Sequence, residues 1–221
     1  MLLPVNRSYE ALYGSFAWAV PPRFNMASAA CDVWAEADPD RPAIFDVGRD
    51  QSIRVTSYGA LARQSRRLAK ALVGRGIARG DRVAVLLPQG AMVPVAHLAV
   101  YRMGGIAVPL AILFGVDALQ FRLANAGVRA IVTDAAGVAK LRSIRAALPG
   151  LELIVSIDGD DGEAVGHDRL VAGVDDDFAT VDTSCDDPAL MIYASGTTGQ
   201  PKGALHAHRV LLGHLPGVQW P

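Results

Sequence analysis

Apolar residues recur at helical spacing early in the chain. Between residues 58 and 73 they follow the i, i+3, i+4 pattern of one helix face, while arginines, a glutamine and a lysine occupy the other face. Thr56 or Ser57 can cap the start of this helix, and Gly74 and Gly76 favour its end. The spacing therefore predicts an amphipathic helix that ends in a glycine-rich turn.

Short continuous apolar runs follow this helix at a regular interval. They begin at Arg82, Ile106, Arg129 and Leu151, and their starts are 24, 23 and 22 residues apart. Each gap has room for a short helix. Apolar strands that alternate with helices are typical of a parallel sheet covered on both faces. We therefore predict an α/β fold with a mostly parallel sheet of βα units, with strands near 82–87, 106–109, 129–133 and 151–155.

Charge is distributed unevenly along the 221 residues. Residues 1–157 carry 18 basic and 11 acidic residues, residues 158–187 carry 11 acids and only Arg169, and residues 188–221 carry no acid. The acidic segment is typical of a solvated linker or surface excursion. Calcium binding is the alternative, but no D-x-[DN]-x-[DN]-G spacing supports it. We predict an N-terminal α/β subdomain over 1–187 that ends in this linker, and the start of a further subdomain over 188–221.

The composition of the chain excludes several classes of protein. Hydrophobic residues make up 51% and the formal net charge is −1, so a core can be buried and no basic excess exists for nucleic acid. The most apolar stretch, 83–115, is interrupted by polar residues and prolines, which predicts no membrane span. Arg7 and Glu10 argue against a signal peptide. Cys31 and Cys185 are typical of reduced thiols, and together these features predict a cytoplasmic protein.

The clearest chemistry lies in a loop that follows a further predicted strand, 189–194. The sequence from Tyr193 to Gly203 is YASGTTGQPKG. Gly196 and Gly199 allow backbone conformations closed to other residues, and successive amides in such a loop can converge on an anion. The loop also offers hydroxyl donors from Ser195, Thr197 and Thr198 and a positive charge from Lys202. A polyphosphate is the ligand that best matches so many donors and one cation.

The loop is not a Walker A loop, although Lys202 falls at the right distance from Gly196. That motif requires Gly where Pro201 stands, and Ser or Thr where Gly203 stands. These departures argue against an unrelated P-loop phosphotransferase, which stays an alternative. A hairpin loop rich in turn-forming residues is the structural alternative.

Three histidines follow the loop, and a His206-x-His208 pair can bind a metal. With no Cys or carboxylate nearby, we expect instead a surface that flanks the loop.

The loop resembles the phosphate-binding loop of the adenylate-forming enzymes, a superfamily that includes acyl-CoA synthetases, luciferases and the adenylation domains of peptide synthetases. Eight loop residues fit that signature, and Ala194 stands where Thr is common. Residues 24–45 resemble the entry helix and Pro-Asp-Arg-Pro turn of AMP-forming acyl-CoA synthetases, and residues 57–88 resemble the helix and strand that follow there. Residues 203–217 are most similar to the acetate and medium-chain branch.

The resemblance implies a reaction in two steps. A small or medium-chain carboxylic acid attacks the α-phosphate of ATP, giving acyl-AMP and pyrophosphate, and coenzyme A then attacks the acyl carbon. Mg²⁺ accompanies ATP, and the resemblance assigns no metal ligand in this chain. Lys202 would be catalytic by neutralising the β- and γ-phosphates. The nucleotide-binding residues would be Ser195, Gly196, Thr197, Thr198, Gly199 and Lys202.

In this superfamily the adenine, ribose and magnesium motifs and the mobile C-terminal domain lie downstream of the loop. The resemblance therefore identifies the chain as the N-terminal part of the large domain, without the C-terminal half and the small domain. We expect this part alone to be inactive. A non-catalytic nucleotide-binding or assembly module that keeps the fold is the alternative, and either interpretation leaves room for a homo-oligomer.

Overall fold

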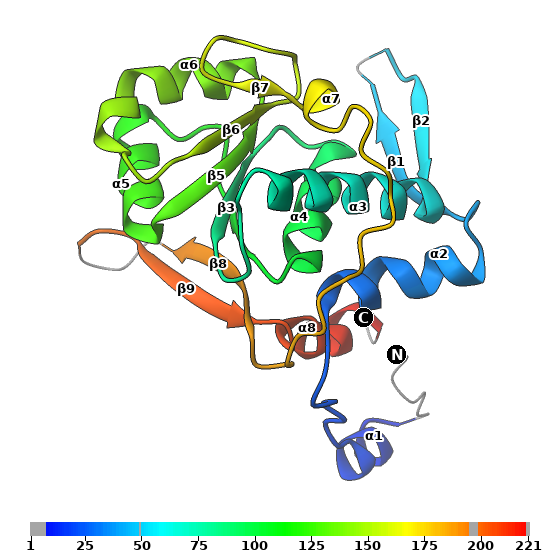
Figure 1. The fold of residues 1–221 in the computed structure, drawn as a ribbon. Coiled ribbons are helices and arrows are strands. Elements are labelled where there is room, and N and C mark those ends of the chain that lie inside the picture. The colour runs from blue at the N-terminus through cyan, green and yellow to red at the C-terminus, as the bar shows by residue number, and fades with distance from the viewer. Residues whose placement is uncertain (1–7, 49, 195–198, 220–221) are drawn as a thin grey trace.

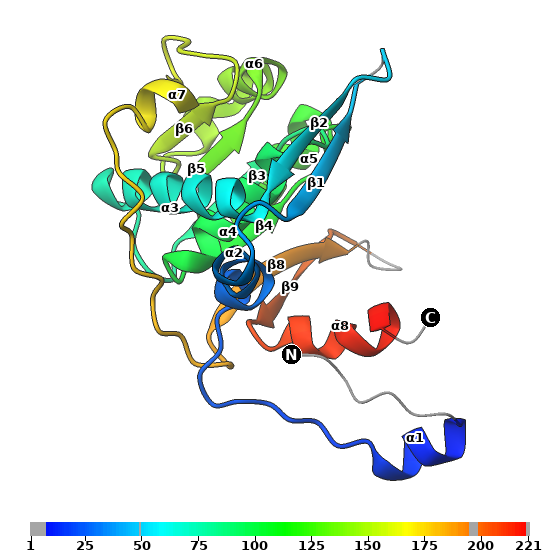
Figure 2. The ribbon, with the colours of Figure 1, turned by 90° about the vertical axis from the view of Figure 1, so that its right-hand side faces the viewer.

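The computed structural model describes residues 8–48, 50–194 and 199–219. Its first helix, α1 (Tyr9–Ser15), buries none of its residues and lies apart from the body in both views (Figures 1 and 2). A π-helical turn, Ser28–Asp32, then continues into α2 (Val33–Ala37) and leads to the body of the molecule.

A seven-stranded sheet forms the centre of the molecule (Figure 1). The strand order is β7-β6-β5-β3-β4-β8-β9, and all neighbours are parallel except β8 and β9. The prediction of an α/β fold with a mostly parallel sheet is confirmed. The strands are β3 (Arg82–Leu86), β4 (Ile106–Pro109), β5 (Val128–Thr133), β6 (Leu153–Ser156), β7 (Val165–Gly166), β8 (Pro188–Ala194) and β9 (Lys202–Ala207).

Helices cover the sheet on both faces. α3 (Tyr58–Gly74) and α4 (Met92–Arg102) share one apolar core with alternate strand residues such as Val83 and Val85. α5 (Val116–Ala126) and α6 (Ala135–Ile144), which leads into a 3₁₀ turn (Arg145–Ala147), share a second core with the residues between them. This is the pattern expected of strands that are apolar on both sides.

The predicted amphipathic helix is α3. Its N-terminal cap is Ser57, whose side chain accepts a hydrogen bond from the Ala60 N–H at 3.3 Å. The helix ends at Gly74, and Gly76 follows with a φ of +86°. A side chain is strained at that angle, so the turn requires glycine there.

A separate antiparallel hairpin, β1 (Pro42–Val47) and β2 (Ile53–Ser57), was not among the predicted strands. Phe45 lies opposite Val55 and Val47 opposite Ile53, so these four share one face, and each is 53–63% exposed. The hairpin therefore presents an apolar outer face, which we call the hairpin face.

The acidic segment 158–187 is a surface excursion held by ion pairs. It includes β7 and α7 (His167–Leu170). Lys70 pairs with both Asp175 and Asp177, and Arg79 pairs with Asp187. The excess of basic residues before residue 158 is thus matched in space by the excess of acids after it.

The chain then returns to the sheet through β8 and β9 and enters α8 (Val210–Gln219). These strands extend the same sheet, and the division into subdomains at residue 187 stays a prediction. In the part of the chain that the structure describes, no helix has both the length and the hydropathy needed to cross a membrane.

Candidate functional site

The predicted phosphate-binding loop, residues 195–201, connects β8 and β9. Ala194 pairs with Lys202 at the mouth of the β8–β9 hairpin, so residues 195–201 form the connection. Because β8 runs parallel to β4, the chain leaves β8 at the carboxyl ends of the parallel strands. Open α/β sheets bind their ligands just outside these carboxyl ends.

Two of the predicted nucleotide-binding residues have a described structure. Gly199 has a φ of +97°, an angle that side chains rarely adopt, and Lys202 is the exposed first residue of β9. The predictions for Ser195, Gly196, Thr197 and Thr198 lie outside the described residues.

The charge of Lys202 is free to meet a ligand. No carboxylate occurs in the sequence from residue 188 onward, and no described residue forms an ion pair with Lys202. A lysine ammonium is a compact point charge suited to phosphate. The described geometry therefore fits a phosphate group approaching this edge.

Tyr193 was not among the predicted site residues, but the structure gives it a contact next to the loop. It precedes the loop, and its hydroxyl donates a hydrogen bond to Oδ1 of Asn125 on α5 at 2.6 Å. Tyr193 stands in the motif itself, so its position could be read from the sequence. Its partner could not, because 68 residues separate the two.

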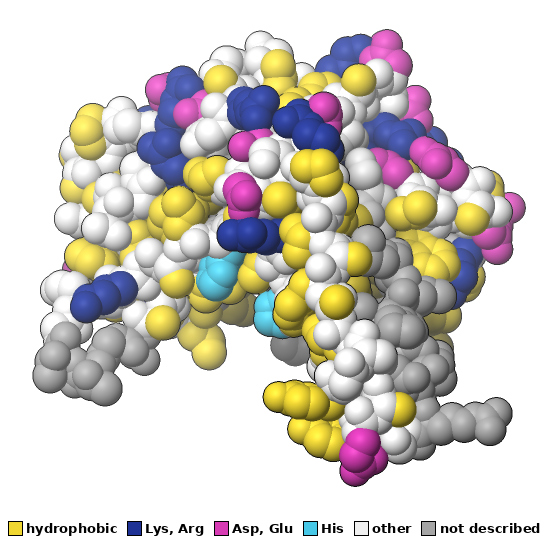
Figure 3. All heavy atoms as spheres, turned by 90° about the horizontal axis from the view of Figure 1, so that it is seen from below, with side chains coloured by type: hydrophobic (Ala, Val, Ile, Leu, Met, Phe, Trp, Pro, Cys, Tyr) yellow, Lys and Arg dark blue, Asp and Glu magenta, His cyan; other side chains and the backbone are white. Residues whose placement is uncertain are grey.

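The three histidines after the loop differ in their surroundings. On the face seen in Figure 3, histidine and hydrophobic side chains lie together. His206 is half-buried and His214 is exposed. The expectation of a flanking surface is wrong for His208, which is fully buried, and whose Nδ1 accepts a hydrogen bond from the Met26 N–H at 3.2 Å.

Burial lowers the pKa of His208 to about 4, so its ring is neutral near pH 7. With Nδ1 acting as acceptor, the proton resides on Nε2. Among the described residues, no three His, Cys, Asp or Glu side chains gather where they could hold a metal ion.

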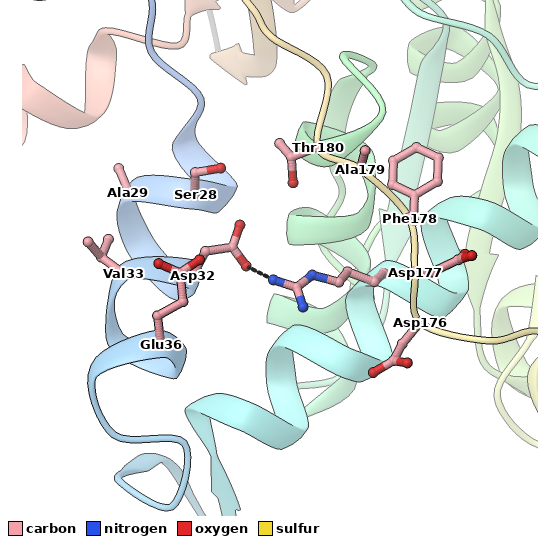
Figure 4. Close-up of a pocket in the computed structure, with 11 residues that line it drawn as sticks. Ser28, Ala29, Asp32, Val33, Glu36, Asp176, Asp177, Phe178, Ala179 and Thr180 are labelled. Atoms are coloured by element: carbon pink, nitrogen blue, oxygen red, sulfur yellow. Dashed lines mark hydrogen bonds and ion pairs between the residues drawn. The ribbon is translucent and has the colours of Figure 1, made fainter.

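A cavity of about 590 Å³ lies elsewhere, between the Ser28–Asp32 turn with α2 and residues 176–180 (Figure 4). The carboxylate of Asp32 forms an ion pair with the guanidinium of Arg66, at 2.8 Å. No described residue of the loop between β8 and β9 lines it. Three of its charged residues, Asp32, Arg66 and Asp177, already pair within the protein, so we do not assign the candidate site to it.

The family model described as "AMP-binding enzyme" matches residues 31–219. Acetyl-coenzyme A synthetase 2 of Zygosaccharomyces bailii is 30% identical over 224 residues, covering 92% of this chain and 33% of that protein. A probable non-canonical nonribosomal peptide synthetase, CymA of Salinispora arenicola, is 32% identical over 182 residues, covering 82% of this chain and 2% of its own length.

The fold has solved counterparts. The acyl-CoA synthetase of Brucella canis superposes with a TM-score of 0.83 at 24% identity, covering 94% of this chain and 40% of that one, which shows a shared fold. The chain spans about a third of the length of the acetyl-coenzyme A synthetase that it matches. With a family model that matches most of its length, and a sheet and loop arranged as described, the chain belongs to the family of AMP-binding enzymes.

Proposed function

We propose that the protein to which this chain belongs activates a carboxylic acid with ATP and transfers the acyl group to coenzyme A. The observation that carries the proposal is the exposed Lys202 at the carboxyl ends of the parallel strands, which has no ion-pair partner among the described residues, in a chain of the AMP-binding family. The similarity to acetyl-coenzyme A synthetases supports coenzyme A as the acceptor.

In the proposed reaction, a carboxylate oxygen attacks the α-phosphorus of ATP, and the bond to the bridging oxygen breaks to release pyrophosphate. The thiolate of coenzyme A then attacks the acyl carbon, and AMP leaves with the electron pair of the broken C–O bond. A carboxylate oxygen leaves poorly, whereas AMP leaves well, and this is the reason for the first step.

Lys202 would neutralise the negative charge that moves onto pyrophosphate as it departs. Such a group acts by electrostatic stabilisation and positioning. We propose that Ser195, Thr197 and Thr198 donate hydroxyl hydrogen bonds to the same phosphates, and that Gly196 and Gly199 let the backbone approach them. Mg²⁺ would accompany ATP, and we assign no residue of this chain to it.

We further propose a small or medium-chain monocarboxylate as the acid and the cytoplasm as the location. The similarity of residues 203–217 to the acetate and medium-chain branch motivates the choice of acid. The two cysteines, Cys31 and Cys185, are free and buried, which agrees with a reducing compartment.

Acid-dependent exchange of labelled pyrophosphate into ATP, measured on the product of the complete gene, tests the proposal. We expect exchange with acetate, butyrate or octanoate, followed by thioester formation when coenzyme A is added. Preferential exchange with amino acids would overturn the choice of acid. Release of phosphate from ATP without any acid would favour a phosphotransferase instead.

A further inference from the structure

Tyr193 and Gly203 lie directly opposite each other in the β8–β9 hairpin. They follow the Ala194–Lys202 pair, which is the pair nearest the loop. Opposite residues of an antiparallel pair share one face of the sheet. A Cβ atom at Gly203 would lie 3.2 Å from Cζ of Tyr193 and 3.0 Å from Sδ of Met191. The tyrosine ring and the thioether therefore occupy the space that a side chain at position 203 would need.

The far end of Tyr193 is fixed to α5. Its hydroxyl donates to Oδ1 of Asn125 at 2.6 Å, with the Arg122 carbonyl oxygen also within reach at 3.2 Å. The guanidinium of Arg122 lies 5.7 Å from the centre of the Tyr193 ring and 4.1 Å from that of Phe114. One aromatic side chain thus connects the mouth of the hairpin to α5.

This connection supports a part of the hairpin that the sheet does not. The register of β8 with β4 consists of one pair, Leu190 with Ala107, at the end of β8 remote from the loop. α5 is itself anchored, because its Leu119 and Leu123 are buried in the core. Tyr193 therefore attaches the free end of the hairpin to a fixed helix.

We infer that Tyr193 is a positioning residue for Lys202, acting through Gly203. This inference rests on the proposed function, in which Lys202 meets the phosphates of ATP. The ring of Tyr193 restrains the backbone at Gly203, and Lys202 is the next residue along the strand. Loss of the hydroxyl should let this end of the hairpin move, and the ammonium would then spend less time where the phosphates bind.

Three variants of the complete gene product test the inference. Tyr193→Phe keeps the ring and removes the hydroxyl, Asn125→Leu removes the acceptor, and Asn125→Asp is the matched control that keeps an acceptor oxygen. We expect Tyr193→Phe and Asn125→Leu to raise the KM for MgATP in acid-dependent exchange about 3- to 10-fold, the range of one hydrogen bond. Asn125→Asp should stay near the wild type.

Two further measurements separate positioning from a general loss of stability. The double variant Tyr193→Phe with Asn125→Leu should be no worse than Tyr193→Phe alone, because the bond that Asn125→Leu removes is already lost with the hydroxyl. Conversion of pre-formed acyl-adenylate to thioester should be unchanged, since pyrophosphate has already left. A uniform loss in both half-reactions would mean that Tyr193 only stabilises the fold, and would overturn the inference.

Hydrogen exchange over residues 199–207 provides a readout that does not need catalysis. We expect faster amide exchange in Tyr193→Phe and Asn125→Leu, and wild-type exchange in Asn125→Asp. Unchanged exchange in the first two variants would overturn the inference even if the protein proved to have another activity. If the wild type lacks acid-dependent exchange, the proposed function fails, and hydrogen exchange still decides whether Tyr193 holds the hairpin.

Discussion

Arg102 and Asp32 form a buried ion pair, with 2.7 Å between Nη1 and Oδ2, although 70 residues separate them in the sequence. Arg102 is fully buried, and it also donates to the Ser65 and Thr180 hydroxyl oxygens. Burial by itself would raise the pKa of Asp32, but Arg102 and Arg66 outweigh that effect and lower it. The pair joins the π-helical turn to α3, α4 and the end of the acidic segment.

Removal of the charge of Arg102 should destabilise the fold. In Arg102→Met the volume is nearly kept, but Asp32 loses a buried partner, and breaking a buried pair costs about 3–5 kcal/mol. Denaturant unfolding of the chain measures the change. The control is Arg142→Met, because Arg142 pairs with Asp161 at the surface, where little change is expected. Equal unfolding midpoints for the two variants would contradict the prediction.

Two histidines, the half-buried His97 and the fully buried His208, should make stability depend on pH. Burial lowers the pKa of His97 and of His208 to about 4 each, compared with about 6.5 in an unfolded chain. Between these values the unfolded chain binds more protons than the folded one. The free energy of unfolding should therefore fall as the pH drops from about 6.5 to about 4, by up to about 1.4 kcal/mol per pH unit for each histidine.

His208→Gln isolates one of these contributions, because a glutamine oxygen can still accept the hydrogen bond from Met26. We expect the free energy of unfolding, measured between pH 7 and pH 4.5, to depend less strongly on pH in this variant than in the wild type. His214→Gln is the control, since His214 is exposed. A pH dependence of His208→Gln as steep as that of the wild type would count against the prediction.

Lys202 should matter for one half-reaction only. In the complete gene product, Lys202→Ala should reduce acid-dependent pyrophosphate exchange by about 100-fold, the scale for losing one group that stabilises developing charge. Thioester formation from pre-formed acyl-adenylate should change little. Lys70→Ala is the control, because Lys70 pairs with Asp175 and Asp177. Equal losses in both half-reactions would assign Lys202 a structural role.

Residues 1–221 expressed alone should form no thioester. In the proposed function Gly199 and Lys202 would contact only the phosphates of ATP, and the chain spans about a third of the length of the acetyl-coenzyme A synthetase that it matches. The purified chain is incubated with ATP, Mg²⁺, acetate or octanoate, and coenzyme A. Thioester above the level of a Lys202→Ala sample would show that the catalytic groups lie elsewhere.

The hairpin face should promote self-association of the isolated chain. Phe45, Val47, Ile53 and Val55 form one exposed apolar patch, and such patches favour association. Sedimentation velocity over a concentration series should show association that Phe45→Ser with Val55→Ser reduces. Val73→Ser, at an exposed valine on α3, is the control. A chain that is monomeric throughout the series would refute the prediction.

The sequence by itself determined the elements that depend on neighbours along the chain. The period of apolar residues and the cap at Ser57 predicted α3, and the apolar runs predicted β3 to β6 and that these strands run parallel, though not their order in the sheet. The loop 195–203 was recognised because its glycines, hydroxyls and lysine are consecutive. Periodicity, capping and turn chemistry are local properties, and for this reason they are visible in the sequence.

Only the tertiary structure decided which distant segments meet. The sequence did not predict the hairpin face, because its apolar residues are exposed. Alternation of apolar and polar residues along a strand does not show which of its two faces is buried. Arg102 could have been taken for a surface residue at the end of a helix, yet it is buried because Asp32 reaches it from another segment. Tyr193 and Asn125 likewise meet only because α5 packs beside β8, and packing of this kind depends on the whole fold.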